Sequence, residues 1–74
     1  MNKKRRIQIE EAVSKINLAL SLVQDVLDEE SESYENMTEG LRRTENGIIS
    51  EEAIENLETA IGALEDSVFY LEEI

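Results

Sequence analysis

One short segment of the sequence mixes the residue types that bind small anionic ligands. It holds a phenol ring, an amide, two apolar side chains and two guanidinium groups, in Tyr34, Asn36, Met37, Leu41, Arg42 and Arg43. Guanidinium groups bind phosphate through paired hydrogen bonds, and a tyrosine ring stacks on nucleobases. The segment is therefore a candidate site for a small nucleotide ligand or a partner. The alternative is that Tyr34, Met37 and Leu41 cap the end of a helical bundle while the arginines neutralise nearby acids.

Acidic side chains form the largest charged feature. The chain has 18 acids against 7 bases in 74 residues, which gives a net charge of -11. All the bases precede Thr44, so the acids that follow have no base in their own part of the chain. On the predicted second helix, one outer strip carries Glu51, Glu55, Glu58, Glu65 and Asp66. This strip is either a solvated face that maintains solubility or a surface that docks on a basic partner. Direct binding of nucleic acid is not expected, because its phosphates carry the same sign of charge.

The composition argues against catalysis and metal binding. The chain lacks both cysteine and histidine, which removes the usual thiol nucleophile, the usual proton-transfer residue near neutral pH and the usual zinc ligands. A second acidic run, from Asp25 to Glu35, lacks the loop pattern of a calcium-binding EF-hand. We therefore predict a protein that is not an enzyme, with no catalytic residue, no cofactor and no metal.

Two heptad seams must position these side chains. Apolar residues recur at alternating intervals of three and four, as in helices that pack along one stripe. The predicted core, for the helix pair and for its oligomer, consists of Ile9, Val13, Ile16, Leu20, Val23, Leu27, Ile54, Leu57, Ile61, Leu64, Val68 and Leu71. The predicted fold is all-α, an antiparallel two-helix hairpin that associates into a homo-oligomeric helical bundle. A chain this short rarely buries enough apolar surface alone, so the partner is first of all a second copy.

The expected boundaries follow from caps and breakers. A single domain, 1–74, contains a first helix over about 3–33, a connector over about 36–49 and a second helix over about 50–73. Ser50 is the predicted N-cap of the second helix, and Thr38 caps a single turn that holds Leu41. Gly40 and the Asn46-Gly47 pair are read as helix breakers.

The basic start of the chain, Lys3 to Arg6, has a predicted structural role. An antiparallel arrangement brings it beside Glu65, Asp66, Glu72, Glu73 and the last carboxylate, which fixes the register by charge. Glu11 and Lys15 form a favourable pair one turn apart. No apolar run approaches the length of a membrane span, and no signal-peptide pattern follows the basic start. A soluble protein of the cytosol is expected.

Three segments carry a resemblance to a known family. They are the basic start Met1 to Arg6, the central Tyr34 to Leu41, and Glu51 to Leu57. Together they resemble a widespread family of small acidic helical proteins carried by bacteriophages and integrative elements of Gram-positive bacteria. The resemblance implies action inside the host cell, by occupying a host protein or sequestering a signal molecule.

The leading functional hypothesis is a counter-defence inhibitor whose acidic faces dock on a basic, nucleic-acid-binding surface of a host immune protein. One alternative is an oligomeric sponge that sequesters a nucleotide second messenger through Tyr34, Arg42 and Arg43. Another is a structural or assembly hairpin without an inhibitory role.

Overall fold

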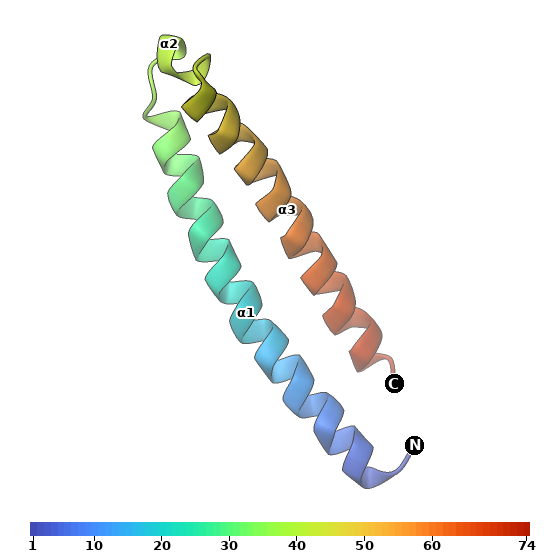
Figure 1. Ribbon diagram of the computed structural model, residues 1–74. Helices are drawn as coiled ribbons and strands as arrows, with labels where there is room; N and C mark the ends of the chain where they lie inside the picture. Colours follow the sequence, from blue (N-terminus) through green and yellow to red (C-terminus); the bar gives the residue numbers. More distant parts are fainter.

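The computed structural model describes residues 1–74 and is entirely helical (Figure 1). Helix α1 spans Lys3–Glu35, the single turn α2 spans Glu39–Arg42, and α3 spans Glu45–Glu72. The prediction of an all-helical chain is confirmed. None of the three helices combines the length and the apolarity that crossing a membrane requires.

The two long helices lie side by side and run in opposite directions (Figure 1). Two hydrogen bonds join their ends. Arg6 Nη1 donates to the main-chain oxygen of Ile74 at 3.3 Å, and Ser50 Oγ donates to Glu30 Oε1 at 2.6 Å. The first bond links the start of α1 to the residues after α3, and the second links the end of α1 to the first turns of α3. The result is a rod of 58 × 15 × 14 Å, called the helix pair below.

The heptad seams lie where the two helices meet. All twelve predicted seam residues, six on each long helix, are half-buried. No apolar side chain is fully buried, and the only buried residues are Gly47 and Ser50 at the start of α3. Two helices cover each other along a single stripe, so every seam residue keeps one side open to solvent.

Each helix begins at a side-chain cap that satisfies a main-chain N–H in its first turn. Asn2 accepts from Arg5 at 2.8 Å for α1, and Thr38 accepts from Leu41 at 3.3 Å for α2. The predicted single turn capped by Thr38 is thus confirmed. The cap of α3 is Thr44, which accepts from Gly47 N at 3.5 Å.

The prediction of Ser50 as an N-cap is wrong. Ser50 lies within α3 and faces α1, where its hydroxyl donates to Glu30. It extends the seam by one step of the heptad before Ile54, and a hydroxyl with an internal partner is stable at a buried position. The second helix therefore begins before the predicted boundary, and the non-helical connections reduce to 36–38 and 43–44.

The prediction that Gly40 and Gly47 break helices is also wrong. Gly40 lies in α2 and Gly47 in α3, and no glycine of the chain has a positive φ. Gly47 is needed for a different reason. A Cβ at this position would overlap main-chain atoms of Arg42, so only glycine allows α2 to fold against the start of α3.

The expected ion pairs at the open end do not form, and only Arg6 reaches the end of the chain, through its hydrogen bond to the main-chain oxygen of Ile74. Lys3, Lys4 and Arg5 make no ion pair, and neither do the acids expected to face them. The reason is length. Because Arg6 already reaches Ile74, the first turn of α1 projects past the end of α3 (Figure 1). The expected pair of Lys15 with Glu11 is present at 3.2 Å.

Candidate functional site

A row of acidic residues follows the outer side of α3. This acidic strip is defined as Glu51, Glu55, Glu58, Glu65 and Asp66. All five side chains are exposed. Four of them follow the heptad, with intervals of four, three and seven between Glu51 and Glu65. A helix rises about 1.5 Å per residue, so these two carboxylates lie about 21 Å apart along the axis. Asp66 lies beside this line, on the side turned away from α1.

No base neutralises the strip. The chain forms two ion pairs, Lys15 with Glu11 at 3.2 Å and Arg43 with Glu39 at 3.0 Å, and both lie outside α3. α3 itself contains no lysine or arginine. Neighbouring carboxylates one turn apart repel one another at a small cost in stability. The strip therefore presents a row of free carboxylates to any partner.

An exposed aromatic ring extends the acidic strip, a feature that the sequence reasoning missed. Phe69 is 57% exposed, and it lies eighteen residues after Glu51. Eighteen residues make five full turns of an α-helix, so the ring projects from the same side as the strip. Its place four residues after Glu65 was the signal that could have identified it. Large rings in otherwise polar surfaces are common anchors of protein interfaces.

Tyr34 and Arg42 are brought together, but in a structural contact. The Arg42 guanidinium carbon lies 4.9 Å from the centre of the Tyr34 ring. Its Nε donates to the Tyr34 carbonyl at 3.2 Å and its Nη2 to the Glu35 carbonyl at 3.0 Å. These carbonyls belong to the last turn of α1, which contains no base of its own. Arg42 therefore supplies the positive charge that favours a helix C-terminus.

The other members of the central group point to different surroundings. Arg43 is exposed and pairs with Glu39, one turn away in sequence. Asn36 is the C-cap of α1, and Met37 is half-buried beside it. Leu41 is exposed, so it does not cap the seam in the helix pair. The group does not converge on one cavity, and both guanidinium groups already have partners within the chain.

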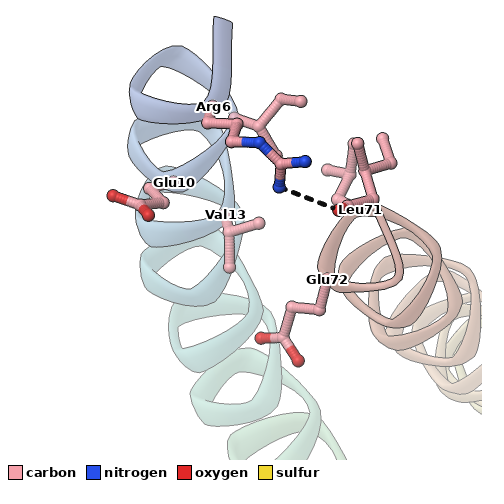
Figure 2. Close-up of a pocket in the computed structure, with 7 residues that line it drawn as sticks. Arg6, Glu10, Val13, Leu71 and Glu72 are labelled. Atoms are coloured by element: carbon pink, nitrogen blue, oxygen red, sulfur yellow. Dashed lines mark hydrogen bonds between the residues drawn. The ribbon is translucent and has the colours of Figure 1, made fainter. Parts of the chain in front are cut away.

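A cleft that the sequence reasoning missed lies at the open end of the helix pair (Figure 2). It encloses about 320 Å³ over an apolar floor of Ile9, Val13 and Leu71. Figure 2 shows Arg6 reaching across from α1 toward the end of α3, while Glu10 points away from the cleft. The cleft exists because α3 ends at Glu72, one residue after the last seam residue, Leu71, while α1 continues past this point. Its lining offers apolar contact and mixed charges, and no cluster of metal ligands occurs anywhere in the chain.

No known protein family, curated protein or solved structure matches the chain.

Proposed function

We propose that the chain is a non-enzymatic counter-defence protein of a bacteriophage or mobile element, acting in the host cytosol. Its acidic strip docks on a basic, nucleic-acid-binding surface of a host immune protein and blocks that surface. The observation that carries the proposal is the row of exposed, unpaired carboxylates on a helix without a single base. The resemblance of the basic start, the central segment and Glu51 to Leu57 to small acidic phage proteins supports the same reading.

The charge distribution favours a protein partner over nucleic acid. The chain carries -11 in total, and residues 44–74 contain nine acids and no base. A surface of this kind attracts lysine-rich and arginine-rich grooves and accelerates the encounter with them. In this proposal, the free carboxylates of the acidic strip take the place of nucleic-acid phosphates in such a groove. Phe69 adds the apolar anchor that a purely electrostatic contact lacks.

We further propose that the helix pair is a hairpin that works as a homo-oligomeric bundle. The absence of any fully buried apolar side chain supports this part of the proposal. A core that remains half-open in one copy becomes closed when a second copy covers it.

The alternative of a nucleotide sponge receives less support. Arg42 donates to two main-chain carbonyls and Arg43 pairs with Glu39, so a phosphate would have to displace contacts within the chain. The alternative of an assembly hairpin has one observation in its favour, the exposed apolar surface. This alternative predicts self-association without a host partner. The experiment below distinguishes that outcome from the capture of a host protein.

The test is a pull-down from a Gram-positive host lysate, with competition by duplex DNA. The unaltered chain is expected to capture a host protein that added duplex DNA or moderate salt releases. The triple variant Glu51→Gln, Glu55→Gln, Glu58→Gln is expected to bind at least tenfold more weakly, because it removes three charges without changing size.

The matched control removes three acids from α1, in Asp25→Asn, Asp28→Asn and Glu29→Gln. It changes the net charge equally and is expected to keep most of the binding. Equal losses in both variants would show that only net charge matters, and binding that is insensitive to DNA and salt would contradict the proposed surface. In a purified complex, Phe69→Ala is expected to weaken binding as well, because it removes the anchor.

A further inference from the structure

Besides its seam and its acidic strip, α3 carries a third row with heptad spacing. This row, called the uncharged row, consists of Ala53, Asn56, Ala60, Ala63, Ser67 and Tyr70. The intervals alternate between three and four, so these residues share one side of the helix. Five of the six side chains are exposed and Ala53 is half-buried. The row follows the packing period, and the interactions of its side chains are local: Ser67 Oγ donates to the Ala63 carbonyl, and the Tyr70 ring packs edge-on against Phe69. It is therefore a helix face without a partner helix.

The uncharged row continues onto α1. Ala53, Ala60 and Ser67 each precede a seam residue of α3, just as Ala12, Ala19 and Val26 precede seam residues of α1. In two helices that run in opposite directions, the residues that stand immediately before a seam residue lie on the same side of the pair in both helices. Leu22, 67% exposed, and Val26, 50% exposed, lie on this side of α1. On α1 this side also carries Lys15, which precedes Ile16, and Glu29, so its uncharged part runs from Ala19 to Val26. That part and the uncharged row of α3 form one surface, called the uncharged face.

The acids lie on the opposite side. Glu55, Glu58 and Glu65 each follow a seam residue of α3, which turns them away from the uncharged face. Two chains that each carry -11 repel one another through any acidic surface. The uncharged face is the one side of α3 through which a second copy approaches without bringing carboxylates together.

The exposed area supports a second copy as the occupant. The helix pair exposes 5773 Å², whereas a compact monomer of its 8.4 kDa exposes about 4,600 Å². The excess of about 1,200 Å² exceeds the roughly 800 Å² that each partner buries in a standard interface. The elongated shape thus leaves enough surface for a stable dimer.

We propose that the uncharged face docks a second copy of this chain, with the two α3 helices antiparallel and centred between Ala60 and Ala63. This deepens the self-association in the proposed function and rests on it. The row is complementary to its own reverse: Ala60 meets Ala63, Asn56 meets Ser67, and Ala53 makes room for Tyr70. A parallel arrangement would instead place Asp66 and the neighbouring acids level with their own copies.

Engineered cysteines test the arrangement, because the chain has no cysteine of its own. An equimolar mixture of Asn56→Cys and Ser67→Cys is expected to form a disulfide-linked dimer on mild oxidation. Neither variant alone is expected to do so, since each residue lies about 16 Å along the axis from its own copy. The matched control mixes Glu58→Cys with Glu65→Cys, which have the same midpoint on the acidic side, and no cross-link is expected.

Sedimentation of an uncrosslinked variant gives an independent readout. Ala60→Glu is expected to reduce the sedimenting mass to that of one 8.4 kDa chain, while Thr59→Glu, on the adjacent outer side, leaves the dimer intact. A dimer that survives Ala60→Glu, or a cross-link formed by Asn56→Cys alone, overturns the proposed face. Circular dichroism of Ala60→Glu separates lost association from lost helix. Loss of the dimer with host binding retained, or the reverse, distinguishes this inference from the docking of the acidic strip.

Discussion

At the scale of single residues, Arg42 shows how a group suited to ligand binding is used for folding. Its guanidinium closes the end of α1 through the carbonyls of Tyr34 and Glu35, and it covers the Tyr34 ring. We expect Arg42→Ala to lower the free energy of unfolding by about 2 kcal/mol, because charge-assisted hydrogen bonds and a cation–π contact are lost. Urea unfolding followed by circular dichroism measures the change.

The matched control is Arg43→Ala. Its ion pair with Glu39 is largely exposed, with 78% and 84% of the side chains accessible, so a change below about 0.5 kcal/mol is expected. Arg42→Lys should lie between the two, since an ammonium group reproduces the charge but not the paired geometry. Equal effects of Arg42→Ala and Arg43→Ala would mean that the cap contributes nothing.

Gly47 is the second residue that decides local structure. We expect Gly47→Ala to lower the free energy of unfolding by at least about 1 kcal/mol, because the added methyl group collides with the Arg42 main chain. Gly62 is the contrasting position within the same helix, with open space where its Cβ would lie. Gly62→Ala should therefore stabilise the chain by up to about 1 kcal/mol through helix propensity. Thermal unfolding of both variants checks the opposite signs.

At the scale of elements, the seams and the outer ends of the two long helices could be predicted from sequence, whereas the start of α3 could not. Heptad spacing is a local property, and every seam residue from Ile9 to Leu71 is half-buried as its spacing requires. The start of α3 depends on contacts with residues outside that helix. Gly47 resembles a turn residue until Arg42 is seen against it, and Ser50 resembles a cap until Glu30 is seen opposite.

The candidate surfaces were predictable to different degrees. The acidic strip follows from composition and period, so the exposure of its members needed no tertiary information. The interpretation of Arg42 failed to foresee its partners, because main-chain carbonyls at a helix end leave no mark in the sequence. The open-end cleft depends on the relative lengths of α1 and α3, which the positions of all four caps of these two helices set together.

Helix α3 should be destabilised by its own acidic strip. Glu51, Glu55 and Glu58 repel one another across single turns, at about 0.2–0.5 kcal/mol for each pair. We expect Glu51→Gln, Glu55→Gln, Glu58→Gln to raise the free energy of unfolding by about 0.5–1 kcal/mol at low salt. Added salt should shrink this difference, because it screens exposed charges. Urea titrations at two salt concentrations measure it, and a salt-independent gain would point to propensity instead of repulsion.

At the scale of the whole molecule, stability and association should be inseparable. The helix pair contains no fully buried apolar side chain, so we expect a second copy that covers the uncharged face to contribute a large part of its stability. We expect the melting temperature to rise by roughly 4–5 °C for each tenfold increase in chain concentration. Calorimetry over two decades of concentration tests this. A melting temperature that does not change with concentration would identify a self-sufficient monomer.

Because α1 extends beyond α3, the tip and the flank of the rod carry opposite charges. Its projecting tip carries Lys3, Lys4 and Arg5 without partners, while its flank carries the free carboxylates of α3. A basic partner surface should attract the flank and repel the tip, so we expect the rod to turn broadside before it makes contact. Approach in this orientation brings the whole row of carboxylates to the partner at once. The few unpaired bases should thus orient the approach. Their removal should lower the association rate constant more than it lowers the stability of the finished complex.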